Sequence, residues 1–160
     1  ISIGDSALNY VSKNKLLKHK KDWFNSDEFS ISADLRLNFL KIYDGLQLIY
    51  RTDDKKFKLE GIEAIKFYNN NIENCYSMFD EIVSDIKNMF KSADISSKET
   101  NIHPADKLGE TKVTDIAIYM PNNDIITVAC YDWSKESGFG DQLRISLRTS
   151  EYAKFLLTAY

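Results

Sequence analysis

The chain has 160 residues, of which 43% are apolar and 28% are charged, and its formal net charge is −3 at pH 7. These values are typical of a single globular domain over residues 1–160, and the negative charge disfavours a nucleic-acid-binding protein. Because every apolar run is short, the sequence predicts no transmembrane segment.

The first half of the chain predicts a short helix followed by three strands. Asp5 or Ser6 is a suitable N-cap, and apolar residues follow at helical spacing up to about Lys18. Alternate positions are then apolar from Phe29 to Phe39, which is the two-residue period of a half-buried strand. The three strands are expected over residues 29–39, 46–51 and 57–67.

Gly61 interrupts the third of these strands. Phe57 and Leu59 are apolar at odd positions, whereas Ile62 and Ala64 are apolar at even positions. A change of phase at a glycine predicts a β-bulge.

The longest predicted helix covers residues 72–90. Its apolar residues recur at steps of three and one, which gives an amphipathic stripe, and Asn70 with Glu73 predicts an N-terminal cap. A polar connection over residues 92–111 separates this helix from strands at 112–120 and 124–133. A loop at 134–141, a strand at 143–147 and a helix capped by Thr149 or Ser150 complete the chain.

The predicted fold class is α+β. The hairpin-length connections favour antiparallel pairing, so we expect a sheet of about six strands with the helices packed on one face. The expected order of elements is α-βββ-α-βββ-α.

Cys75 and Cys130 are the only cysteines. Cys75 lies on the apolar stripe of the long helix, and Cys130 shares one strand face with Ile126 and Val128. We predict a disulfide that ties the helix to the C-terminal strands, although two buried free thiols remain an alternative. The chain begins at Ile1 rather than at methionine, which favours a cleaved leader and an extracytoplasmic (periplasmic or secreted) location, although N-terminal trimming would give the same start.

His103 and Asp106 lie in the polar connection, where functional residues are common. They form a candidate general base with its orienting carboxylate, to which Asp132 adds a third group for a hydrolase-like enzyme. No glycine-framed nucleophile accompanies them. The alternative interpretation is that His103 packs or bonds to fix its loop.

Tyr131, Asp132 and Trp133 end a predicted strand beside the loop at 134–141. Aromatic rings with a carboxylate at a strand end are suited to line a sugar or small-molecule cleft. Arg144 on the next strand is either an anion-binding group or an ordinary surface charge. The two histidines and two cysteines lack the spacing of metal ligands, so we predict no metal and no cofactor.

Residues 13–24 form a basic segment that ends in Trp23 and Phe24. Five lysines occur between positions 13 and 21 without an acidic residue, a pattern compatible with anionic lipid headgroups. A solvated helix end is the alternative interpretation.

Several segments resemble small exported bacterial proteins of unknown function: residues 4–10, 74–76, 103–107 and 128–134. This resemblance implies export but no activity. We therefore expect a non-enzymatic extracytoplasmic domain that binds a protein, an envelope component or a small ligand. A hydrolase-like enzyme and a peripheral membrane-surface protein are the alternatives.

Overall fold

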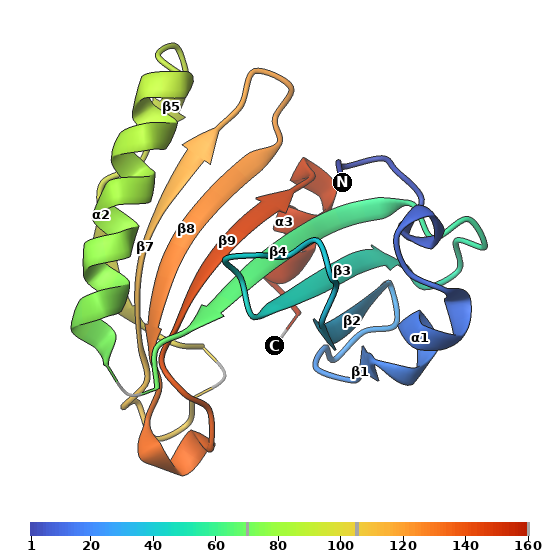
Figure 1. Ribbon diagram of the computed structural model, residues 1–160, viewed down its shortest axis with the longest axis horizontal. Helices are drawn as coiled ribbons and strands as arrows, with labels where there is room; N and C mark the ends of the chain where they lie inside the picture. The colour runs from blue at the N-terminus through green and yellow to red at the C-terminus, as the bar shows by residue number, and fades with distance from the viewer. Residues whose placement is uncertain (70, 105, 160) are drawn as a thin grey trace.

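The computed structural model describes residues 1–69, 71–104 and 106–159, and Asn70, Ala105 and Tyr160 lie outside them. Within these residues the chain forms one twisted antiparallel sheet of nine strands in the order β1-β2-β3-β4-β9-β8-β7-β5, and β6 also pairs with β7 (Figure 1). The strands are β1 (Lys20–Lys21), β2 (Phe29–Leu35), β3 (Gly45–Arg51), β4 (Leu59–Phe67), β5 (Asp94–Ile95), β6 (Glu99–Ile102), β7 (Lys112–Tyr119), β8 (Ile125–Asp132) and β9 (Gln142–Arg148).

Three α-helices and two 3-10 helices accompany the sheet in the described residues. The α-helices are α1 (Lys13–Lys18), α2 (Ile72–Met89) and α3 (Ser150–Leu156), and the 3-10 helices are η1 (Ala7–Asn9) and η2 (Lys135–Ser137). No helix in the described part of the chain is long and apolar enough to cross a membrane. Thr149 caps α3 by accepting a hydrogen bond from the Tyr152 amide, as its position in the sequence predicts.

The antiparallel sheet is confirmed, but the prediction of six strands in a simple α-βββ-α-βββ-α order is wrong. The six long strands lie close to their predicted positions, and β1, β5 and β6 are additional. These three strands have two to four residues and lie in polar segments, so they lack an apolar period that would reveal them. The first predicted helix is divided into η1 and α1, because Ser12 caps a new helix.

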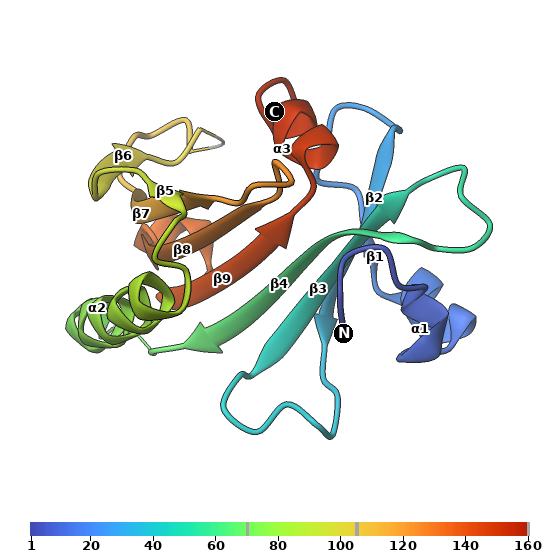
Figure 2. The ribbon, with the colours of Figure 1, turned by 90° about the horizontal axis from the view of Figure 1, so that it is seen from above.

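The helices cover both faces of the sheet, so the prediction that they share one face is wrong. Neighbouring residues of β3 point to opposite sides: Leu48 packs in the cluster that contains Leu16 of α1, whereas Ile49 packs with Tyr152 and Phe155 of α3. Helix α2 packs on β8 and β9, and α3 lies across the sheet from α1 and α2 (Figure 2). We call the two sides the α2 face and the α3 face.

The predicted bulge at Gly61 is confirmed. Ile49 pairs with Gly61 and Tyr50 pairs with Leu59, so Glu60 is the extra residue. A β-carbon at Gly61 would lie 3.0 Å from ring atoms of Tyr152, which explains why the residue that packs beneath α3 has no side chain.

The apolar phase predicted from Phe29 to Phe39 does not hold through β2. Asp34 has a left-handed backbone with φ of 55°, and the pairing with β3 shifts between Ser32 and Leu35. Phe29 and Ile31 therefore face α3, whereas Leu35 packs in the cluster beneath α1.

The predicted disulfide between Cys75 and Cys130 is confirmed. It joins α2 to β8 with a Cα–Cα distance of 6.0 Å, and both residues are fully buried.

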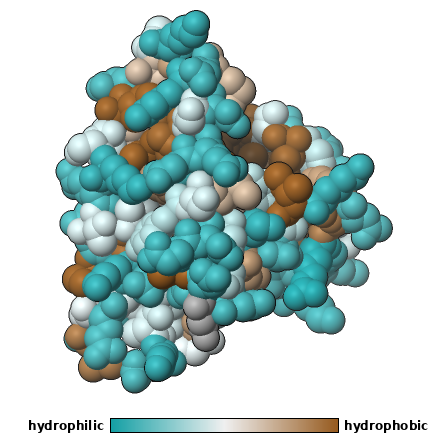
Figure 3. Space-filling view, turned by 60° about the vertical axis from the view of Figure 1, so that its left-hand side comes forward, coloured by the Kyte–Doolittle hydropathy of each residue, from teal (hydrophilic) through white to brown (hydrophobic). Residues whose placement is uncertain are grey.

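Helix α2 begins at an Asn71 cap, whose side chain accepts from the Asn74 amide, and the predicted cap at Asn70 lies outside the described residues. Viewed from the side of α2, the surface shows apolar patches separated by polar side chains (Figure 3).

The two halves of the chain share one hydrogen-bonded framework. Strand β4 of the first half pairs with β9 of the second from Gly61 to Phe67. The single-domain organisation over residues 1–160 stays a prediction, and this pairing is the feature that favours it.

Replacing both cysteines with alanine is expected to destabilise the protein by about 4 kcal/mol. The bridge closes a loop with a sequence separation of 55, and cross-linking reduces the entropy of the unfolded chain. Urea unfolding of the oxidised protein and the double variant Cys75→Ala/Cys130→Ala measures the difference. Dithiothreitol should destabilise the first protein and leave the second unchanged, and equal midpoints without the reductant would contradict a structural role for the bridge.

Candidate ligand-binding pocket

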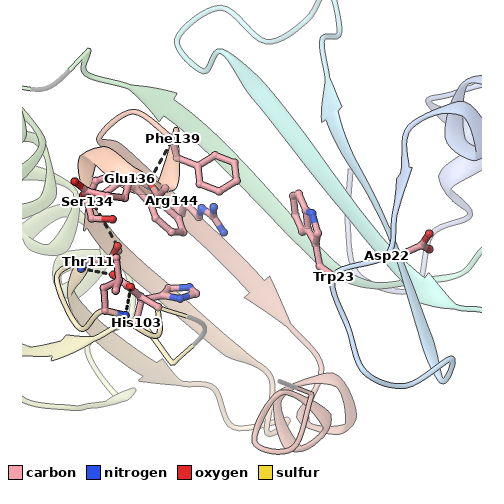
Figure 4. A pocket seen from close by; sticks show the side chains of 12 residues that line it. Asp22, Trp23, His103, Thr111, Ser134, Glu136, Phe139 and Arg144 are labelled. Atoms are coloured by element: carbon pink, nitrogen blue, oxygen red, sulfur yellow. Dashed lines mark hydrogen bonds between the residues drawn. The ribbon is translucent and has the colours of Figure 1, made fainter.

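A pocket of about 530 Å³ lies on the α3 face (Figure 4). The segment between β1 and β2 forms one wall, and the loops before β7 and after β8 form the opposite wall. Arg144 of β9 extends from the sheet between them. The lining residues are Asp22, Trp23, His103, Asp106, Leu108, Thr111, Trp133, Ser134, Glu136, Ser137, Phe139 and Arg144.

An ion cluster of Glu63, Arg144 and Arg148 lies on the α3 face of β4 and β9, and its Arg144 lines the pocket. Alternation along β9 directs Arg144, Ser146 and Arg148 to the α3 face, and Glu63 of β4 is paired with Ser146, diagonal to both arginines. Nη2 of Arg148 lies 3.0 Å from Oε1 of Glu63, and Nη1 of Arg144 lies 3.7 Å from Oε2. Burial alone would raise the pKa of Glu63, but the charges of Arg148 and Arg144 outweigh it and hold the pKa below its ordinary value.

The guanidinium of Arg144 is held against an aromatic ring. Its central carbon lies 4.3 Å from the Tyr131 ring centroid, within the range of a cation–π contact. With the Gln142 amide oriented to suit its neighbours, the amide oxygen accepts from Nη2 of Arg144 at 3.0 Å and from the Trp133 indole. Nε of Arg144 is buried without a hydrogen-bond partner among the described residues.

Four rings form an aromatic wall beside Arg144. Tyr131 and Trp133 lie two residues apart and share a face of the chain, and their rings stack with centroids 5.6 Å apart. Trp133 also contacts His103 at 5.0 Å and Phe139 at 4.8 Å. The structure therefore brings together three of the predicted site residues, His103, Tyr131 and Trp133, with Arg144.

Asp106 organises the loop before β7. Its carboxylate accepts hydrogen bonds from the amides of Leu108, Glu110 and Thr111, at 2.9, 3.2 and 2.6 Å. Hydrogen bonds from the hydroxyl and amide of Thr111, joined by the other two amides, lower the pKa of Asp106 to about 2. The Thr111 hydroxyl in turn accepts from the Ser134 amide at 3.2 Å, which links the two loops of this wall.

The surroundings of His103 favour the neutral imidazole. Burial lowers its pKa and the positive charge of Arg144 lowers it further, against a smaller opposing effect of Asp106. The amide of His103 donates to the carbonyl of Thr111 at 2.9 Å, and its carbonyl accepts from the Asp106 amide at 2.9 Å. His103 is thus fixed in its loop and lines the pocket.

Asp132 lies outside the pocket lining. It alternates with Tyr131 and Trp133 along the strand and therefore points to the other side of the sheet. Burial raises the pKa of Asp141, and the negative charge of Asp132 raises it further. The Asp141 carboxylate accepts a hydrogen bond from the Trp133 amide at 3.3 Å. Of the three residues predicted for a hydrolase, the structure brings His103 and Asp106 to the pocket and places Asp132 away from it.

The basic segment contacts the rest of the protein at several points. Lys15 donates to the carbonyl of Arg36 at 3.0 Å, and Lys21 pairs with Asp34 at 2.7 Å. The ring of Phe24 packs 5.1 Å from that of Phe155 on α3. Trp23 lines the pocket and is 39% exposed.

Trp23, Phe139 and Thr111 are pocket residues that the sequence does not identify. Trp23 is separated from the opposite wall by about a hundred residues of chain and forms part of a pattern that suggests lipid binding. The chain contains only two tryptophans, and both line this pocket, so tryptophan content is the sequence feature that points to Trp23.

No protein family model, no curated protein and no solved structure matches this chain. Within the described residues no group of three or more His, Cys, Asp or Glu side chains is placed to hold a metal ion. The class of site is therefore defined by its geometry: a concave, aromatic-lined pocket with a guanidinium at its floor.

Substitution of Asp106 with asparagine is expected to lower stability in a pH-dependent way. The folded-state pKa of about 2 lies below the ordinary value of 3.8, so the carboxylate stabilises the fold above about pH 4. This contribution is lost as the pH falls towards 2. Urea midpoints of the wild type and Asp106→Asn should therefore differ at pH 6 and converge near pH 2.

The control for this comparison is Asp53→Asn at an exposed turn, which should match the wild type throughout. A difference between wild type and Asp106→Asn that stays constant from pH 6 to pH 2 would argue against the charge as the cause.

Proposed function

We propose that the protein is a non-enzymatic extracytoplasmic domain that binds a small organic ligand in this pocket. The observation that carries the proposal is the arrangement of aromatic side chains from two distant parts of the chain around one open space. Trp23 faces Phe139 across it, and Arg144 reaches in between them (Figure 4). A volume of about 530 Å³ lies within the ordinary range of ligand pockets.

The placement of the polar groups favours binding over hydrolysis. The carboxylate of Asp106 is committed to backbone amides of its own loop, and Asp132 lies outside the pocket. His103 is left beside Arg144, whose charge opposes protonation of the imidazole. Among the predicted partners, a concave pocket favours a small ligand over a protein or envelope component.

The extracytoplasmic location is part of the same proposal. Disulfides persist in oxidising compartments and are rare in cytosolic proteins, and the Cys75–Cys130 bridge is consistent with export. The resemblance of several segments to small exported bacterial proteins points in the same direction.

Tryptophan fluorescence tests the proposed site directly, because both tryptophans line the pocket. A screen of saccharides, amino acids and small aromatic acids should give ligands that change the emission and raise the melting temperature. Trp23→Ala should weaken their binding about tenfold, because one stacking surface is lost.

Phe39→Ala is the matched control, because Phe39 is an exposed aromatic residue between β2 and β3, outside the pocket lining. It should leave the affinities unchanged. Ligands that bind Trp23→Ala as tightly as the wild type would refute this site, and so would a screen without any binding.

A further inference from the structure

We infer that the pocket selects a planar ring that carries a carboxylate, with Arg144 binding the carboxylate and the aromatic walls binding the ring. This inference rests on the proposed function and names the chemical class of its ligand. It follows from the charge, the hydrogen-bond donors and the ring surfaces of the pocket.

The charge that enters the open space is positive. Figure 4 shows the guanidinium of Arg144 extending between Phe139 and Trp23, whereas the carboxylate of Asp22 points away from that space. The carboxylate of Asp106 is bound by three amides of its own loop. Glu136 is exposed on η2 at the rim.

The nearest negative charge does not fully satisfy Arg144. Glu63 forms its hydrogen bond with Arg148 at 3.0 Å and lies 3.7 Å from Arg144, beyond hydrogen-bond distance. Asp115, which also approaches this cluster, interacts with Arg148. Two guanidiniums therefore share one closely bound carboxylate, and Arg144 is the less neutralised of the two.

Arg144 also has donors to spare. A guanidinium carries five N–H groups. With the Gln142 amide oriented to suit its neighbours, Nη2 donates one of them to the amide oxygen, and Nε is buried out of reach of a ligand, so the spare donors are those of Nη1 and the second N–H of Nη2. Contact with the Tyr131 ring fixes the guanidinium plane, so its remaining edge is preorganised. A carboxylate matches this fork with two parallel hydrogen bonds, which a neutral amide cannot reproduce.

The ring surfaces determine the rest of the ligand. Trp133 and Phe139 contact each other with centroids 4.8 Å apart, and Trp23 lies on the opposite wall. Trp23 and Phe139 are 39% and 55% exposed, so both have area left to bury. A planar aromatic ring between these walls would gain stacking or edge-to-face contacts on both sides.

The test compares phenylacetate with its neutral isostere phenylacetamide by saturation-transfer NMR and by tryptophan emission excited at 295 nm. Phenylacetate should bind roughly tenfold more tightly, because charge-assisted hydrogen bonds are about twice as strong as neutral ones. Cyclohexylacetate, which keeps the charge without the planar ring, should bind more weakly than phenylacetate.

Arg144→Gln should abolish the preference for phenylacetate, and Arg144→Lys should reduce it while keeping a cation beside Glu63. Arg36→Gln, at an exposed arginine before β3, is the matched control and should preserve the preference. A second readout remains if an Arg144 variant fails to fold: bound phenylacetate should raise the pKa of His103 in the wild type, and phenylacetamide should not.

Three outcomes are decisive. Tighter binding of phenylacetate that depends on Arg144 supports the inference. Equal binding of the two probes, lost in Trp23→Ala, overturns the inference and leaves the proposed ligand-binding function in place. Binding of neither probe overturns the inference, while the broader ligand screen decides the proposed function separately.

Discussion

The pocket depends on the ion cluster in which Glu63 holds two arginines on the α3 face. Burying a carboxylate is costly unless cations and hydrogen bonds compensate for the lost water, and Arg148, Arg144 and Ser146 supply them. The register of β4 against β9 brings these groups together, because Glu63 is paired with the residue between the two arginines. Without Glu63, the two neighbouring guanidiniums would repel each other without a carboxylate between them, and Arg144 would lose an interaction that holds it beside Tyr131.

The two faces of the sheet have different roles: the α2 face holds the disulfide-linked apolar cluster, and the α3 face holds the pocket. On the α2 face, α2 and the Cys75–Cys130 bridge cover an apolar cluster that includes Phe79, Val128 and Leu143. On the α3 face, the region over β9 and β8 carries charged and aromatic residues and is left open as the pocket. Because α3 packs over Phe29 and Ile49 instead, the helix closes one end of this face without filling the site.

Much of this arrangement follows from local sequence patterns, and the remainder depends on long-range contacts. Alternation in β8 and β9 predicts that Trp133 and Arg144 lie opposite the residues that face the core, and the phase change at Gly61 predicts the bulge. The left-handed turn at Asp34 has no equivalent signal, so the predicted face of β2 is wrong beyond it. Asp106 resembles a catalytic carboxylate in sequence, because only the folded loop shows the amides that occupy it. Trp23 joins the site through the pairing of β1 with β2, which two residues of strand cannot reveal.

The central claim is that both walls of the pocket contact one ligand at the same time. A ¹⁵N-correlated NMR spectrum tests this claim through the indole N–H resonances of Trp23 and Trp133. These residues are the only tryptophans of the chain and lie on opposite walls of the pocket. We predict that both resonances shift with the same dissociation constant during a phenylacetate titration, while the backbone amide resonances of residues on the outer surface of α2 do not shift. Shifts with different dissociation constants, or shifts confined to residues outside the pocket, would contradict this account.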